Sequence, residues 1–306
     1  MRKVAAINTR SGRLGWPAFV PVTTLTGEFP LDDLVRPFIG RLSQCALVSM
    51  HYARGVDRKT VDVPLMLDSG GFAVLGEGSR IEEVAELGTV VTSEEDGTEV
   101  TLSPSSVLQR QEELAEIGFT LDFPIPPGTE RQEVERRMRL TLANARWAVA
   151  NRRRRDLVLF GGVVGETAQD YIDLAKEMVA SGVEGLAIGG MVPRSANWGV
   201  VEEIVKGVVG VAGNMPVHVF GIGKPSRVQA LFSLGATSCD SSSYVRAAAE
   251  GRVWGMGRVE APDMATKLHG ALSNLASATG RVPMGMAVGT RWLEVVFQEE
   301  GVSDEV

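Results

Sequence analysis

The stretch VHVFGIGKPSRVQALFSLGATSCDSSSY, residues 217–244, contains two short apolar runs joined by a glycine-rich turn and a segment of helical period. The runs Val217–Gly221 and Thr237–Asp240 predict strands. Pro225 stands where the helix between them begins, a first-turn position that tolerates proline. A strand, a helix and a second apolar strand in this order predict one unit of a parallel sheet that is covered by helices.

This unit repeats along the chain. Eight such units favour a closed α/β barrel, the (β/α)8 TIM barrel, over an open doubly wound sheet. The predicted strands are Ala18–Val22, Cys45–Met50, Pro64–Asp68, Phe119–Asp122, Leu157–Val164, Gly185–Gly189, Val217–Gly221 and Thr237–Asp240. The predicted helices are Leu31–Arg41, Pro104–Ile117, Glu130–Arg154, Ala168–Ala180, Trp198–Val211, Pro225–Leu234 and Ser243–Gly251.

Two segments fall outside the repeat. A long insertion, Ala73–Leu102, follows the third strand, and its part TVVTSEEDGTEVTL predicts a hairpin because β-formers flank an Asp-Gly turn. We expect residues 1–251 to form the catalytic barrel. Residues 252–306 are expected to be a C-terminal extension packed on the barrel, with a helix near Met264–Ala278 and no zinc module.

Composition limits the class of protein. The 306 residues include 31 Lys and Arg against 38 Asp and Glu, a net charge of −7, so no global field attracts a polyanion, although a local basic groove is compatible with this balance. Two Cys cannot build a disulfide framework or a four-thiolate metal site. The N-terminus lacks the apolar core of a signal peptide, and no uncharged apolar run approaches 18 residues. We expect a cytoplasmic protein with no membrane contact.

Three carboxylates end predicted strands. Asp68, Asp122 and Asp240 should meet at the face of the barrel where the strands have their C-terminal ends, which is where barrels carry their functional groups. One such Asp alone is often a helix cap, but three at one rim favour a functional site. Carboxylates a few ångströms apart suit chemistry at an anomeric carbon, so glycosyl transfer or hydrolysis is predicted. The segment Gly221–Pro225 opens a helix at a position where barrels commonly bind phosphate.

Several motifs resemble the tRNA-guanine transglycosylase superfamily, and within it the archaeosine branch most. That family is a (β/α)8 barrel that exchanges guanine in a nucleic acid for a 7-deazaguanine base, and one branch acts on DNA. The resemblance covers most of residues 10–250 in the family's order. The motifs are WPAFVPVTT (16–24), DSGGF (68–72), LSPSSVLQRQ (102–111), LDFPIPP (121–127), GLAIGG (185–190), HVFGIGKP (218–225) and ALFSLGATSCDSSSY (230–244).

The resemblance implies roles for the three aspartates. Asp240 matches the nucleophile that attacks C1′ and forms a covalent glycosyl-enzyme. Asp68 matches the general acid/base, and Asp122 matches the acceptor for the N1–H and 2-amino edge of the base. The other candidate substrate-binding residues are Phe72, which would stack on the base, and Ser69, Gly70, Gly165, Gly189, Gly190, Met191, Gly223 and Lys224.

The chain also departs from the family's pattern. Val164 and Ala73 stand where the family has Gln, which removes two polar contacts to the base. The family's zinc site of three Cys and a His is not matched, because no Cys follows Asp240 and His269 alone cannot hold zinc. We therefore expect no metal and no cofactor, and Val164 and Ala73 leave the base specificity open.

The remaining charged and titratable residues have simpler interpretations. Arg152–Arg155 are predicted at the bottom of the barrel as a solvated helix end. His51, His218 and Cys239 are interpreted as structural residues. The candidates to touch phosphate are Lys224, Arg227, Arg194 and Arg246.

These observations lead to a guanine/7-deazaguanine transglycosylase, a pentosyltransferase, as the predicted function. Its partners would be a purine or 7-deazapurine base and a guanine-containing nucleic acid, with DNA slightly favoured over tRNA because the zinc ligands and appended RNA-binding domains are missing. One alternative is base exchange on a free nucleoside or nucleotide. Another is a non-catalytic subunit of a heterodimeric transglycosylase, and a homodimer is also compatible with the sequence. A metal-dependent barrel lyase is disfavoured because no set of ligands is visible at the rim.

Overall fold

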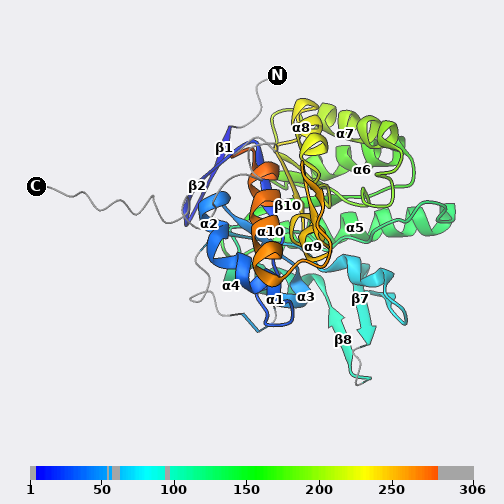
Figure 1. Ribbon diagram of the computed structural model, residues 1–306. Helices are drawn as coiled ribbons and strands as arrows, with labels where there is room; N and C mark the ends of the chain where they lie inside the picture. Colours follow the sequence, from blue (N-terminus) through cyan, green and yellow to red (C-terminus); the bar gives the residue numbers. More distant parts are fainter. Residues whose placement is uncertain (1–4, 54, 57–62, 94–96, 282–306) are drawn as a thin grey trace, which may run out of the picture.

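The computed structural model describes residues 5–53, 55–56, 63–93 and 97–281 (Figure 1). Eight parallel strands form one sheet in the order β3-β13-β12-β11-β10-β9-β5-β4. A parallel bridge between Val22 and Leu47 joins the two edges, and the Thr23 N–H donates to the Leu47 carbonyl at 3.0 Å, so the sheet closes into the predicted (β/α)8 barrel. The strands are β3 (Ala18–Pro21), β4 (Ala46–Val48), β5 (Leu65–Leu67), β9 (Ile117–Phe119), β10 (Val158–Val163), β11 (Gly185–Ile188), β12 (Val217–Val219) and β13 (Ser238–Ser241).

Helices surround the barrel. Ser103 and Thr167 are the N-caps of α4 and α6, and each forms a capping box. The predicted helix Leu31–Arg41 is interrupted at residues 36–38 by a 3-10 turn that contains Pro37, which has no N–H to donate. The helices are α1 (Pro30–Val35), α2 (Ile39–Leu42), α3 (Met50–Ala53), α4 (Pro104–Leu114), α5 (Arg131–Asn151), α6 (Ala168–Ala180), α7 (Trp198–Ala212), α8 (Pro225–Ser233), α9 (Ser243–Ala249) and α10 (Met264–Thr279).

The fourth barrel strand begins and ends earlier than its apolar run predicts. Ile117–Phe119 pair with β10, and α4 ends at Leu114. The side chain of Gln111 binds the strand in this position, because its Nε2 donates to the Leu67 and Phe119 carbonyls at 3.1 and 2.7 Å. A Cβ at Gly118 would lie 2.6 Å from Gln111 Oε1, so this contact requires glycine. The Thr120 N–H still donates to the Phe160 carbonyl at 3.0 Å, and the chain after it carries Asp122 into the loop above the sheet.

The insertion after β5 forms a small antiparallel sheet. Its strands are β6 (Arg80–Val84), β7 (Leu87–Ser93) and β8 (Glu99–Leu102). β7 and β8 pair with Val90 opposite Leu102, as the hairpin prediction requires, whereas β6 was not predicted. The turn of the hairpin, residues 94–96, lies outside the described residues. Figure 1 shows this sheet projecting beside α5, to which Asn144 ties it by bonding the N–H and carbonyl of Gly88 at 3.0 Å each.

The described segments before β3 and after α9 pack against the barrel. α10 packs against α9, α8, α1 and β3. Asn274 on α10 accepts from the Trp254 N–H at 2.7 Å and thereby holds the hairpin of β14 (Arg252–Val253) and β15 (Gly257–Arg258). A hairpin of β1 (Ala6–Thr9) and β2 (Gly12–Gly15) inserts Leu14 into the cluster of side chains inside the barrel. The boundary at residue 251 stays a prediction. Among the described helices, none has the length and apolarity needed to cross a membrane.

Candidate active site

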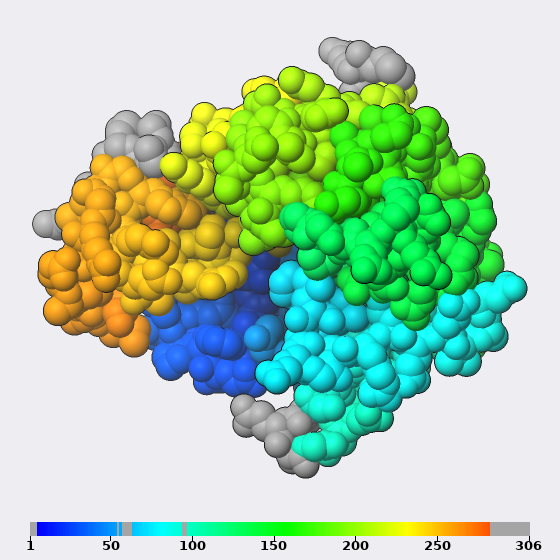
Figure 2. Space-filling view, turned by 90° about the vertical axis from the view of Figure 1, so that its right-hand side faces the viewer, coloured from blue at the N-terminus to red at the C-terminus, as the bar shows by residue number. Residues whose placement is uncertain are grey.

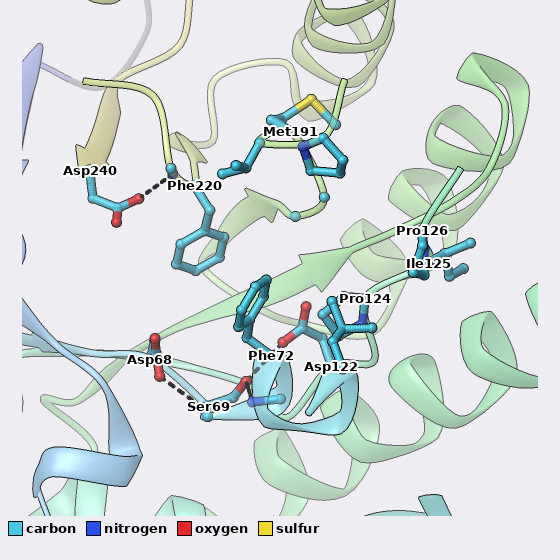
Figure 3. Close-up of a pocket in the computed structure, with 18 residues that line it drawn as sticks. Asp68, Ser69, Phe72, Asp122, Pro124, Ile125, Pro126, Met191, Phe220 and Asp240 are labelled. Carbon is cyan, nitrogen blue, oxygen red and sulfur yellow. Dashed lines mark hydrogen bonds between the residues drawn. The ribbon is translucent and has the colours of Figure 1, made fainter. Parts of the chain in front are cut away.

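A cavity of about 470 Å³ opens at the C-terminal ends of the strands. Asp68 from the end of β5, Asp122 from the loop after β9 and Asp240 from β13 all line it, so the three predicted carboxylates do converge. Figure 3 shows the three side chains around the cavity, and Figure 2 shows a hollow where cyan, green and yellow-orange segments of the chain meet. The rest of the wall is mainly apolar and includes Pro124, Ile125, Pro126, Val192 and Pro193.

Asp68 is held by the main chain. Its Oδ1 accepts from the Gly70 N–H at 2.7 Å and the Met50 N–H at 3.2 Å. Gly70 has φ +72°, a left-handed conformation that glycine adopts without strain. Removal from water raises the pKa of Asp68 to about 6, and these N–H bonds oppose part of that rise. A carboxyl with this pKa can give and take a proton near neutral pH.

Asp122 is a buried carboxylate, 9% exposed. Its Oδ1 accepts from the Ser69 hydroxyl at 2.8 Å, and burial raises its pKa. Two residues that pack against Asp122 must be glycine, because their main chains lie too close to it to leave room for a Cβ. A Cβ on Gly71 would lie 2.0 Å from the Asp122 carbonyl, and one on Gly162 would lie 2.6 Å from the Asp122 Cβ.

Asp240 is hydrogen-bonded to His218, a contact that the sequence analysis did not predict. Oδ1 of Asp240 lies 3.1 Å from His218 Nε2 and accepts from the Gly221 N–H at 3.0 Å. His218 Nδ1 lies 2.8 Å from the Ser238 hydroxyl. The expected buried, hydrogen-bonded His218 is confirmed. The register could have predicted its partner, because His218 pairs with Ser238 and Asp240 is two residues further along the same face.

Two aromatic rings border the cavity. Phe72 is 68% exposed at the rim, and Phe220 lines the opposite side. Figure 3 shows both rings pointing toward the space between Asp240 and Asp122. Phe220 packs on Phe119 and His218, with ring centroids at 4.8 and 4.7 Å. Sequence reasoning missed Phe220, although its place one residue before the Gly221 turn was a usable signal.

The other candidate residues divide between two cavities. Ser69, Gly70, Gly189, Gly190 and Met191 line the first cavity. Gly223 and Lys224 line a second cavity of about 840 Å³ instead. Gly165 lines neither of these cavities, because it packs behind the wall, where its carbonyl accepts from Arg194 Nη2 at 3.0 Å.

The second cavity adjoins the first and is basic. Both cavities share Asp68, Asp240, Val192 and Gly221, so they are continuous. The guanidinium of Arg227 lies 4.1 Å from the ring centroid of Trp198. The cations that line the second cavity are Lys224, Arg227, Arg246 and Arg252, of which Arg252 pairs with Glu250 in the same lining.

Arg194 does not belong to this basic group. It is buried and lines neither of these cavities, so its predicted contact with phosphate is wrong. Arg152 lies at the other end of the barrel, as predicted, but it is not solvated: its side chain is 10% exposed, donates to the Leu157 carbonyl at 2.6 Å and pairs with Glu184.

The two positions where Gln is replaced contribute no polar group to the cavity. Val164 is fully buried, with its Cγ1 3.3 Å from the place of a Cβ on Gly189, and Ala73 lies in the 3-10 turn Gly71–Leu75. No cluster of three or more His, Cys, Asp or Glu among the described residues could hold a metal. Residues 282–306 are not described, so the absence of metal stays a prediction.

The fold and the site together define a (β/α)8 barrel with an apolar, carboxylate-bearing pocket beside a basic cavity. A family model described as queuine tRNA-ribosyltransferase matches residues 2–269. The chain belongs to this family, which confirms the resemblance found in its motifs.

Named relatives agree with this membership. The chain is 32% identical over 164 residues to a tRNA-guanine(15) transglycosylase of Methanococcus aeolicus, which covers 50% of this chain and 25% of that protein. It is 27% identical over 250 residues to the Methanopyrus kandleri protein of the same name, with 79% and 51% covered. It is 28% identical over 285 residues to a queuine tRNA-ribosyltransferase of Cereibacter sphaeroides, with 82% and 70% covered. The chain thus spans only about a quarter to a half of the archaeal relatives.

Proposed function

We propose that this protein exchanges guanine in a nucleic acid for a 7-deazaguanine-type base through a glycosyl-aspartate intermediate. The observation that carries the proposal is the convergence of Asp240, Asp68 and Asp122 on one cavity of a barrel of this family. The presence of all three carboxylates disfavours the non-catalytic subunit as an alternative.

The first half-reaction would use two carboxylates. Both hydrogen bonds of the Asp240 side chain go to Oδ1, so Oδ2 is the oxygen that we expect to attack C1′. As the C1′–N bond breaks, protonated Asp68 gives its proton to the departing guanine. In the second half-reaction a nitrogen of the incoming base attacks C1′, its proton returns to Asp68, and the bond from C1′ to Asp240 breaks. Two displacements retain the configuration at C1′.

The function is tested by label exchange. Labelled guanine is incubated with the protein and tRNA, DNA or guanosine in separate reactions, and incorporation is measured. The names of the relatives specify tRNA as the substrate, whereas the sequence analysis slightly favours DNA. Label in guanosine alone would replace the nucleic-acid proposal by the free-nucleoside alternative, and no label with guanine or a 7-deazaguanine would reject base exchange.

Asp122 is expected to select the base. Its carboxylate can accept from N1–H and the 2-amino group of guanine, whereas adenine presents a lone pair at N1. Asp122→Ala should lower the preference for guanine over adenine about a hundredfold, because unpaired buried polar groups cost a few kcal/mol. Competition between the two bases for binding measures this ratio. An unchanged ratio in a folded variant would remove Asp122 from base recognition.

Lys224 and Arg246 are expected to hold phosphates beside Asp240. Lys224→Gln or Arg246→Gln should raise the KM for a polynucleotide. Each should also reduce the salt slope of its binding, by about 0.7 to 0.9 per lost contact. The control is Lys176→Gln, whose lysine pairs with Asp173 on α6. If the slopes of all three variants equal that of the parent, the second cavity does not bind the polymer.

A further inference from the structure

Arg194 joins three loops behind the first cavity. Its side chain is 5% exposed. Nη1 donates to the carbonyls of Ile125 and Gly190 at 3.1 and 2.9 Å, and Nη2 donates to the carbonyl of Gly165 at 3.0 Å. These acceptors lie in the loops after β9, β11 and β10. One buried guanidinium therefore fixes the spacing of three adjacent loops at the candidate site.

The charge of Arg194 is paired where it lies. Its Nη2 is 3.1 Å from Glu166 Oε2, while Glu166 Oε1 accepts from the Gly128 N–H at 2.8 Å. The ring of Tyr171 lies 5.8 Å from the guanidinium carbon, and the Tyr171 hydroxyl donates to the Gly189 carbonyl at 2.9 Å. Arg194 and Tyr171 thus bind two successive carbonyls of the cavity wall from behind.

The hydrogen bonds to the Gly189 and Gly190 carbonyls set the direction of the N–H groups that follow them, those of Gly190 and Met191. In a trans peptide the C=O and the next N–H point in opposite directions, and the cis peptide in the described chain is elsewhere, at Trp16-Pro17. Gly189, Gly190 and Met191 line the cavity, whereas Arg194 and Tyr171 do not. The N–H groups of Gly190 and Met191 have no acceptor among the described residues. They are therefore directed toward the cavity with their donor capacity unused.

We infer that Arg194 is a positioning residue for recognition of the base. By holding the Gly190 carbonyl behind the wall, it presents main-chain donors to the carbonyl edge of a guanine-type base. These donors stand in for the side-chain donor that is lost at Val164. The inference rests on the proposed function, because it assumes that the base occupies this cavity. Arginine suits the task because its planar fork reaches several carbonyls at once and stays protonated at every working pH.

The test compares three variants. In Arg194→Met we expect the Kd for guanine, measured by equilibrium dialysis, and the KM for guanine in exchange to rise at least about tenfold, the loss expected for one or two hydrogen bonds. The KM for the polynucleotide should not change. Arg194→Lys keeps the charge without the fork and should lie between Met and the parent.

Arg152→Met is the matched control, since Arg152 is a mostly buried arginine that also binds a carbonyl and a glutamate, but at the opposite end of the barrel. It should lower thermal stability and leave guanine binding unchanged. Equal guanine affinity in the parent and a folded Arg194→Lys or Arg194→Met would overturn the inference. A parent that binds guanine but does not exchange it would reject the proposed function alone, and a parent that binds none would reject both.

Discussion

Asp240→Asn is expected to abolish base exchange, with a loss of at least about 10⁴-fold in the rate of guanine incorporation. An amide cannot form the glycosyl ester, so no covalent complex with the nucleic acid should survive denaturing electrophoresis. The fold should persist, because Asn keeps an oxygen that can accept from the Gly221 N–H. Guanine incorporation and the denaturant-stable complex are measured on the same preparations of the parent and the variant.

The control for this substitution is Asp32→Asn. Asp32 is also a buried aspartate, its Oδ2 accepts from the Thr23 hydroxyl and the Thr24 N–H at 2.8 and 3.1 Å, and it lines neither of the two cavities. This variant should lose some stability and keep its exchange activity. A substantial residual rate or a denaturant-stable complex in Asp240→Asn would exclude Asp240 as the nucleophile.

The second large effect concerns Asp68 and pH. In the proposed mechanism, formation of the covalent complex would require the protonated carboxyl of Asp68 as general acid, and burial raises the pKa of Asp68 to about 6. Below pH 6 the acid form predominates. Above it the carboxylate predominates, so the single-turnover rate of complex formation should fall about tenfold per pH unit well above the pKa.

Asp68→Asn should lower this rate about 10²- to 10⁴-fold and remove its decline above pH 6, because the amide does not titrate. Rapid quenching of the parent and the variant between pH 5 and 8 measures both effects. A parent rate that rises with pH over this range, or an identical profile in the variant, would show that Asp68 is not the acid.

Much of the fold was predictable because it depends on local pattern. Short β-branched runs followed by amphipathic helices indicated eight strands. A parallel sheet with helices on its outer face is one of the few arrangements that bury both the apolar strands and the apolar faces of the helices. Boundaries were less predictable. The fourth strand begins two residues earlier than predicted, where Gln111 bonds two strand carbonyls, and its bond to the Leu67 carbonyl spans 44 residues.

The site was predictable to the extent that topology places strand ends at one face. The sequence by itself therefore determined the barrel, the meeting of Asp68, Asp122 and Asp240, and the membership of the family through short contiguous motifs. Only the tertiary structure decided which partners these groups have. His218 bonds to Asp240. Arg194, predicted to contact phosphate, instead bonds the carbonyls of three loops. The physical reason is that strand and helix patterns act over a few neighbouring residues. The direction of a long side chain depends on carbonyls and carboxylates contributed by distant loops.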